Sequence, residues 1–209
     1  MARYKDAKCK LCRREGMKLF LKGAKCNTEK CPFTKRPYSP GVHGKRQSKP
    51  SYYSLQLREK QKAKRLYGVL ERQFRRFFSL AHKAKGATGG ILIQVLERRL
   101  DNVIYRSLFA LSRSEARQIV RHGFVFLGQK RMNIPSYLVE EGQTIHIKGG
   151  DNILKNIRQN IDENSKERSV SPWLSVDKND LKIEIVRLPE RGDVTLPINE
   201  QLIVELYSK

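Results

Sequence analysis

The stretch 97–147 constrains the fold of this chain most, because helix start and stop signals lie close together in it. Ser112 is expected to cap the N-terminus of a helix, and Glu115, three residues later, completes a capping box. Gly123 stands where that helix must end, and Asp101 is a candidate cap for the helix before it. The rest of the stretch has the pattern of strands and turns. It therefore predicts two short helices followed by a compact strand-and-turn unit.

Three arginines recur every four residues in the second of these helices, at Arg113, Arg117 and Arg121. This spacing predicts one stripe of guanidinium groups, with the apolar residues of the helix on the buried side. No acidic residue interrupts the stripe, and each guanidinium group can bind phosphate oxygens bidentately. The stripe is therefore a candidate phosphate-binding surface, and a solvated helix face is the other explanation of the pattern.

The positive charge is concentrated near the N-terminus. Residues 1–85 contain 25 Lys or Arg against 5 Asp or Glu, whereas residues 86–209 contain 18 against 16. Such asymmetry indicates a polyanionic partner, because each neutralised phosphate releases counterions. The sequence has no apolar run of about 20 residues and no secretory signal, so we expect a cytoplasmic chain of one or two domains with reduced cysteines.

All four cysteines lie in one short segment as two close pairs, Cys9 with Cys12 and Cys26 with Cys31. Each pair can supply two corners of a tetrahedral four-thiolate site. We predict one structural metal site, with Zn²⁺ as first choice and an iron–sulfur cluster as the alternative on the same ligands. Two disulfides or four inert thiols would also explain the pattern. A metal would fold a segment too short and too basic to bury a core of its own.

The segment 35–50 is rich in Pro, Gly, Ser and positive charge, which predicts an irregular arm. Along an RNA backbone its cations could neutralise phosphates, and Tyr38 could stack on a base. A flexible linker is the alternative.

Amphipathic helices with basic outer faces are predicted over 52–67 and 71–85, followed by a buried helix from Thr88. Phe74, Phe77 and Phe78 lie opposite the charges of the second helix, so we expect them in the core rather than stacked on bases.

Towards the C-terminus, apolar spacing predicts a helix over 151–163. Alternating residues at 182–185 and 202–206 predict strands that pair with the sheet of the stretch 97–147. The sequence has no phosphate-binding loop, no nucleophile elbow and no His cluster with metal-ligand spacing, so we do not expect an enzyme.

Several segments together resemble the bacterial family of small-subunit ribosomal protein four (the S-four family), over essentially the whole chain. They are RLDNVIYR at 99–106, SRSEARQIVRHG at 112–123, NIPSYLVEEGQTI at 133–145, CPFTKRPYSPGVHG at 31–44 and LPINEQLIVELYSK at 196–209.

The resemblance implies an α+β fold: a mainly helical domain and a small RNA-binding module of two helices on a short mixed sheet, here with an N-terminal four-cysteine metal knuckle. The expected organisation is a knuckle and basic arm at 1–45, a helical domain at 46–97 onto which 165–209 packs back by strands, and the module at 98–164.

The resemblance also implies the function of a structural constituent of the small ribosomal subunit. Such a protein binds small-subunit ribosomal RNA early, nucleates assembly of its five-prime domain, contacts neighbouring ribosomal proteins, lies near the path by which messenger RNA enters, and contributes to translational accuracy. A free RNA-binding regulator or chaperone is the alternative. An RNA-modifying enzyme is another, because the same small module occurs in such enzymes.

The residues expected to contact RNA are cations of these segments, together with one tyrosine and two histidines. They are Arg13, Arg14, Lys22, Lys35, Arg36, Tyr38, His43, Lys45, Arg46, Arg58, Lys62, Arg65, Arg72, Arg76, Arg113, Arg117, Arg121, His122, Lys130 and Arg131.

Overall fold

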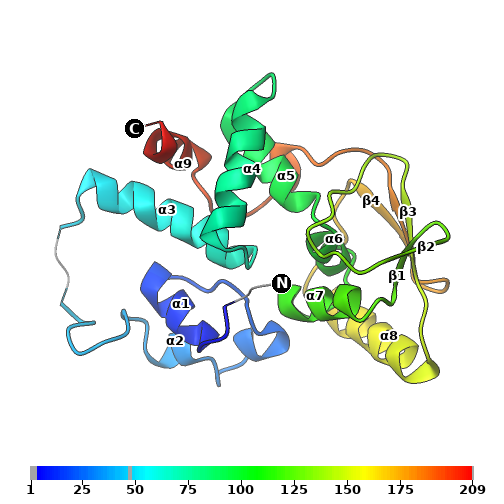
Figure 1. Ribbon diagram of the computed structural model, residues 1–209. Helices are drawn as coiled ribbons and strands as arrows, with labels where there is room; N and C mark the ends of the chain where they lie inside the picture. The colour runs from blue at the N-terminus through cyan, green and yellow to red at the C-terminus, as the bar shows by residue number, and fades with distance from the viewer. Residues whose placement is uncertain (1–3, 47–48, 209) are drawn as a thin grey trace. The chain divides into compact units, whose positions relative to one another are not determined.

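The computed structural model describes residues 4–46 and 49–208 of the chain. They fold into two compact units, which Figure 1 shows coloured along the chain. The first unit extends to Leu92 and resumes at Leu196, and the second comprises Ile93–Thr195. The second unit is therefore inserted into the sequence of the first.

The first unit is built from helices. Ser51 caps α3 by accepting a hydrogen bond from the backbone of its first turn, and Gly68, with a φ of 63°, follows the end of that helix. Phe74, Phe77 and Phe78 of α4 are buried, which confirms them as core residues. The elements are α1 (Lys8–Glu15), η1 (Gly23–Cys26), α2 (Pro32–Lys35), α3 (Tyr52–Leu66), α4 (Glu71–Lys83), α9 (Glu200–Tyr207) and the first half of α5 (Thr88–Glu97).

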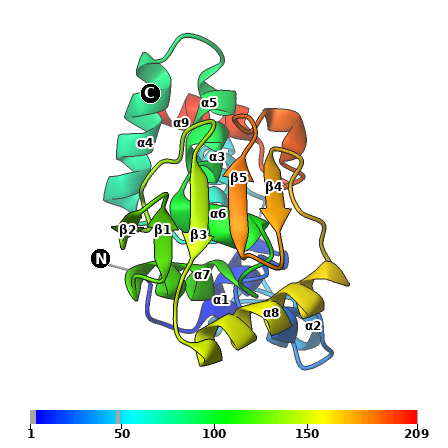
Figure 2. The ribbon, with the colours of Figure 1, turned by 90° about the vertical axis from the view of Figure 1, so that its right-hand side faces the viewer.

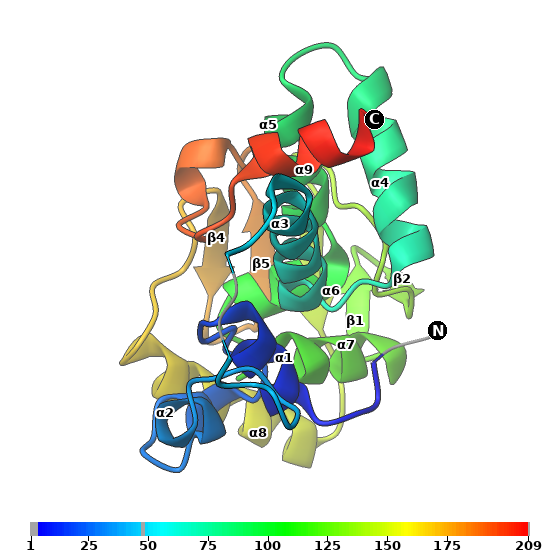
Figure 3. The same cartoon turned by 90° about the vertical axis from the view of Figure 1, so that its left-hand side faces the viewer.

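The last element of the first unit is the helix α9, so the strand predicted at 202–206 is wrong. The side chain of Asn199 accepts a hydrogen bond from the backbone of Gln201 and caps the helix. Helical spacing then places Ile203 and Tyr207 on one face, and Ile203 is fully buried. Figure 3 shows α9 beside α3. The alternating pattern was too short to distinguish a strand from a one-sided helix.

Glu71 ties α3 and α9 to the start of α4. Its carboxylate accepts hydrogen bonds from Lys60 Nζ and Lys64 Nζ, both at 2.9 Å, and from the Tyr207 hydroxyl at 3.0 Å. The Tyr207 ring also stacks on Phe78, with ring centroids 4.4 Å apart. Burial raises the pKa of Glu71, but the three hydrogen bonds outweigh burial and lower the pKa to about 2.

The second unit contains a five-stranded sheet in the order β2-β1-β3-β5-β4. All of its strand pairs are antiparallel, so the expectation of a mixed sheet is wrong. In Figure 2 its strands lie in front of α6 and α7. Apolar residues of α6, α7 and α8 form one core with the strands. The elements are α6 (Leu100–Arg106), α7 (Arg113–Arg121), β1 (Val125–Leu127), β2 (Lys130–Met132), β3 (Thr144–Ile147), α8 (Asp151–Ser165), β4 (Leu174–Asp177), β5 (Lys182–Ile185) and η2 (Arg191–Asp193).

Ser112 and Gly123 cap α7 as predicted, but the Glu115 carboxylate bonds to the residue before Ser112, so the predicted capping box is not formed in full. Ser112 Oγ accepts a hydrogen bond from Glu115 N at 3.3 Å, while the Glu115 carboxylate accepts one from Leu111 N at 2.7 Å. Gly123 has a φ of 75° and follows the end of the helix. The strand predicted at 182–185 is also confirmed as β5. No helix of the described residues has both the length and the apolar character needed to cross a membrane.

We predict that Glu71→Gln lowers the free energy of unfolding and makes that free energy less dependent on pH in the acid range. Because the folded pKa lies below the ordinary value of 4.5, the ionised carboxylate stabilises the protein above pH 4.5, and this contribution is lost as the pH falls towards 2. The side chain is 40% exposed, so solvent screening should limit the loss to about 1 kcal/mol.

Urea unfolding followed by far-ultraviolet circular dichroism at about pH 6 and about pH 3 measures this effect. The control is Glu163→Gln, which removes an exposed carboxylate from α8. Equal acid sensitivity in the wild type and the Glu71 variant would contradict the prediction.

Candidate nucleic-acid interface

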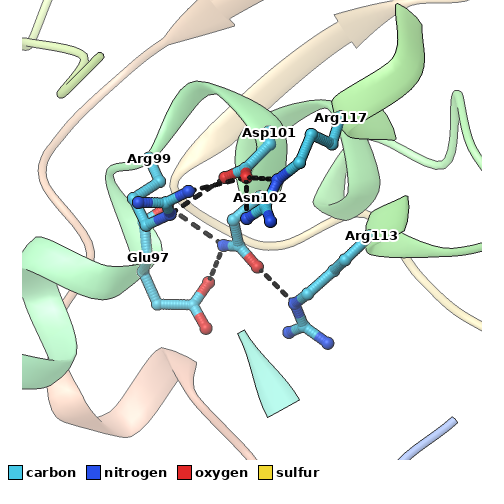
Figure 4. A network of polar contacts seen from close by, with 6 residues as sticks. All are labelled: Glu97, Arg99, Asp101, Asn102, Arg113 and Arg117. Carbon is cyan, nitrogen blue, oxygen red and sulfur yellow. Dashed lines mark hydrogen bonds and ion pairs between the residues drawn. The ribbon is translucent and has the colours of Figure 1, made fainter. Parts of the chain in front are cut away.

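The predicted arginine stripe on α7 is interrupted in the structure by a buried ion-pair network (Figure 4). Arg117 is only 8% exposed, and its Nε and Nη2 lie 2.9 and 2.6 Å from Asp101 Oδ2. Arg99, which is fully buried, donates to both oxygens of the same carboxylate, at 3.0 and 2.7 Å. The expectation of three exposed guanidinium groups is therefore wrong for Arg117.

Asp101 is an ion-pair partner and not the helix cap that the sequence predicted. Arg99 occupies the N-cap position of α6, and Asp101 lies inside the first turn. Bidentate geometry and two cationic partners compensate the cost of burying this carboxylate. The acid that pairs with Arg117 comes from the preceding helix, so spacing within α7 could not reveal it. A charge reversal at Arg117 would disrupt the fold and would not test an RNA contact.

Arg113 is held by the neighbouring residue of the same network. Asn102 Oδ1 accepts a hydrogen bond from Arg113 Nε at 2.8 Å, and Asn102 Nδ2 donates to Glu97 Oε2 at 2.7 Å. Arg113 also lies over the Tyr105 ring, with its Cζ 4.4 Å from the centroid. The Arg113 side chain is therefore half-buried and fixed in direction, while Arg121 at the end of α7 is exposed.

A second group of predicted RNA-binding residues gathers where α7 ends. His122 and Arg131 are exposed there, and Lys130 is exposed at the start of β2, opposite Leu127. Arg131 Nε donates to Gly123 O at 2.8 Å and its Nη2 donates to His122 O at 2.9 Å, so this guanidinium group caps the helix C-terminus. A Cβ on Gly123 would lie 2.2 Å from Arg131 Nε, which is a second reason for glycine at this position.

In the first unit, the exposed face of α4 carries Arg72, Arg75 and Arg76. Arg75 was not among the predicted residues, although it lies on the same exposed face. Of the other predicted cations outside the arm, Arg14 and Lys22 are also exposed.

The predicted cations of α3 are engaged within the first unit. Arg58 and Arg65 both bond to the carboxylate of Glu15, and Lys62 pairs with Glu59. The Glu15 side chain is only 1% exposed, and burial raises its pKa although the two arginines favour the charged form. Arg58 and Arg65 therefore hold α1 and α3 together in addition to carrying positive charge, whereas Lys62 pairs within α3.

The basic arm is attached to α1. Arg13 Nε donates to Tyr38 O at 2.9 Å and its Nη2 donates to Ser39 O at 3.4 Å. Cations of Arg13 and Lys45 lie 5.0 and 5.4 Å from the centroid of the Tyr38 ring. The ring is therefore already in contact with two cations, whereas the remaining predicted RNA-binding residues of the arm are exposed: Lys35, Arg36, His43 and Arg46.

The four cysteines are free thiols in the first unit. Cys9 and Cys12 lie in α1, Cys26 ends η1, and Cys31 precedes α2. Burial raises the pKa of Cys12, and the other three cysteines raise it further. Backbone N–H groups outweigh the burial of Cys31 and lower its pKa.

Hydrogen bonds from the backbone to sulfur favour the thiolate form that metals bind, and Lys22 N donates to Cys26 Sγ at 3.4 Å. Within the ranges 4–46 and 49–208, however, no three His, Cys, Asp or Glu side chains are grouped closely enough to hold a metal ion. The chemistry of the donors suits a metal, but the predicted site is not confirmed.

Comparison with known families divides the chain at almost the same place as its fold. Residues 3–97 match the family described as the ribosomal protein S4/S9 N-terminal domain. Residues 98–145 match the S4 domain, which spans α6, α7 and the strands β1 to β3.

Relatives of similar length match the chain from end to end. The small ribosomal subunit protein uS4 of Dictyoglomus turgidum is 53% identical over 209 residues, which is 100% of both chains. The protein of the same name from Thermus thermophilus is 51% identical over 210 residues, again 100% of both chains. The small ribosomal subunit protein uS4A of Symbiobacterium thermophilum is 52% identical over 209 residues, with the same full coverage.

We predict that Asp101→Asn destabilises the second unit by about 3 to 5 kcal/mol, because it leaves two buried guanidinium groups without their carboxylate. Trp173 is the only tryptophan and is fully buried in the same unit, so its fluorescence reports unfolding in urea. Asp162→Asn, an exposed aspartate of α8, is the control. A loss of stability no larger than that of the control would show that the network does not hold the helices.

Proposed function

This chain belongs to the family of small ribosomal subunit protein uS4, and we propose that it is a structural, RNA-binding component of the small ribosomal subunit. The proposal rests on the sequence identity to proteins of that name, which is 53% and 51% over the full length of both chains. The family is structural and non-enzymatic, in agreement with the lack of catalytic motifs in the sequence.

The finer roles are part of the same proposal. The protein binds ribosomal RNA early, nucleates assembly of the five-prime domain and remains ribosome-bound in the cytoplasm. It contacts neighbouring ribosomal proteins, lies near the path of incoming messenger RNA and contributes to translational accuracy. The excess of positive charge before residue 86 supports an RNA partner, because counterion release favours association of such a surface with phosphates.

The arrangement of cations suggests how the RNA is bound. Exposed cations of the arm and of α4 are free to neutralise phosphates, and they supply affinity without reading sequence. In the second unit Arg121, His122 and Lys130 are also exposed, and the capped end of α7 fixes the backbone at Arg121 and His122. Arg117 contributes indirectly, by holding α7 to α6 through Asp101.

Sedimentation tests the proposed role directly. Epitope-tagged protein expressed in a bacterium is expected to run with small ribosomal subunits in a sucrose gradient at low and at high salt. A free regulator or chaperone would remain near the top of the gradient, and that result would overturn the proposal.

We predict that Arg72→Gln with Arg76→Gln weakens binding to small-subunit ribosomal RNA and reduces its salt dependence. Each lost phosphate contact should lower the slope of log affinity against log salt by roughly 0.7 to 0.9. Filter binding at several salt concentrations measures both quantities. The matched control is Lys155→Gln with Arg158→Gln, which removes the same charge from an exposed face of α8. Equal slopes in the two double variants would contradict a specific role of α4.

We also propose that the four thiols hold one structural metal, Zn²⁺ first and an iron–sulfur cluster as the alternative. Cys9, Cys12, Cys26 and Cys31 would be the ligands, and the bound metal would supply a crosslink between α1, η1 and the start of α2. The support is the spacing of the two cysteine pairs and the N–H groups directed at sulfur. Arg13 follows Cys12 directly, so such a crosslink would also steady the attachment of the arm.

We predict that Cys9→Ser with Cys12→Ser abolishes metal binding and makes residues 1–45 sensitive to protease. The purified wild type should contain about one equivalent of metal, measured by mass spectrometry of the elements, and visible absorption separates iron–sulfur from zinc. Lys10→Ser, an exposed change between the two cysteines, is the control. A cysteine variant that retains both metal and protease resistance would rule out these ligands.

A further inference from the structure

The sheet of the second unit has one face that its helices do not cover. Val125 and Leu127 of β1 contact the core on the inner face, so the alternation of a strand turns Phe126 to the outer face. Figure 2 looks onto this face, with α6 and α7 behind the strands. Phe126 is half-buried and does not belong to the apolar core of the described residues. A large aromatic ring therefore stands on the outer surface of a sheet.

The neighbours of this ring are basic. In the register of the sheet, Phe126 lies opposite Arg131 of β2 on one side and His146 of β3 on the other. The ammonium group of Lys148, one residue beyond β3, lies 5.3 Å from the centre of the Phe126 ring. Arg131 is held by the carbonyl oxygens of His122 and Gly123, so its position does not depend on a partner.

Fold stability alone does not account for this grouping. An aromatic residue on a sheet is normally stabilised by aromatic or β-branched cross-strand partners. The partners here are an arginine and a histidine, and the additional lysine places cations close to each other. One cation–π contact explains Lys148, but the cluster as a whole is most favourable when an anion lies beside the ring.

Charge on the outer face is also polarised. The basic residues next to Phe126 are Arg131 of β2, His146 of β3 and Lys148, one residue beyond β3, whereas the acidic residues Asp177 and Glu184 lie on the far strands β4 and β5. Lys182 of β5 lies opposite both His146 of β3 and Asp177 of β4. A ligand with a flat apolar group and a negative charge fits the basic end alone. A nucleotide has both groups, and a single strand leaves its bases free to stack.

We propose that the outer face around Phe126 binds a single-stranded segment of RNA, with one base stacked on the Phe126 ring and adjacent phosphates bound by Lys148 and Arg131. The inference rests on the proposed function as an RNA-binding protein. It adds a site that reads an unpaired base in the second unit, whereas the arm and α4 belong to the first. Lys148 is exposed, so its ammonium group can leave the ring for a phosphate when a base arrives.

Fluorescence anisotropy tests the site with the full chain and a fluorescein-labelled oligouridine of about 12 nucleotides, a length within the range that sheet-based single-strand sites cover. Phe126→Leu keeps an apolar side chain but removes the ring, whereas Phe126→Tyr keeps the ring. We expect Phe126→Leu to weaken binding by at least about fivefold, the lower end for loss of one base stack, and Phe126→Tyr to bind like the wild type. Fluorescence of the buried Trp173 confirms that each variant is folded.

The outcomes separate this site from the proposed function. Binding of the wild type to small-subunit ribosomal RNA tests the proposed function alone. If the wild type binds that RNA while Phe126→Leu and the wild type bind oligouridine equally, the sheet-face site is wrong and the proposed function stands. If Phe126→Leu impairs sedimentation with small subunits but leaves oligouridine binding unchanged, the face contacts a protein, and the RNA inference is overturned.

Discussion

The carboxylate of Asp101, shared by two buried arginines, is the interaction on which the arrangement of the second unit depends. It joins Arg99 at the start of α6 to Arg117 in the middle of α7. Because an unpaired charge in this place would cost several kcal/mol, the two helices have little freedom to shift relative to each other. The adjacent Asn102 accepts a hydrogen bond from Arg113 and so fixes the position of that side chain as well. The buried negative charge of Asp101 thus positions the basic side chains of α7.

The first unit uses its few acidic residues in a related way. Residues 1–85 carry only 5 of them against 25 cations, yet Glu15, Glu59 and Glu71 all pair with lysine or arginine within the unit. Glu15 and Glu71 each accept two cations, so each offsets repulsion between like charges on α3. The cations that remain exposed, on α4 and the arm, are those available to a polyanion.

Signals within one element predicted several features correctly, although the strand at 202–206 and the cap at Asp101 were wrong. Contacts between elements left no signal in the sequence. The caps of α7 and the buried phenylalanines of α4 follow from local chemistry and helical spacing. The partner of Arg117 lies in another helix, so a pattern within α7 suggested an exposed stripe instead. Phe126 was missed because three residues of β1 are too few for alternation to show, and its basic neighbours meet only through strand pairing.

Because α9 belongs to the first unit but follows the second unit in the sequence, it is the last element of the first unit to be synthesised. Residues 93–195 are synthesised before α9, so the whole inserted unit is made before the first unit receives the tyrosine that binds Glu71. Until then the buried surfaces of α3 and α4 that α9 covers remain open. The first unit is therefore completed late in synthesis, and a chain truncated before α9 would carry its cations on an incompletely folded unit.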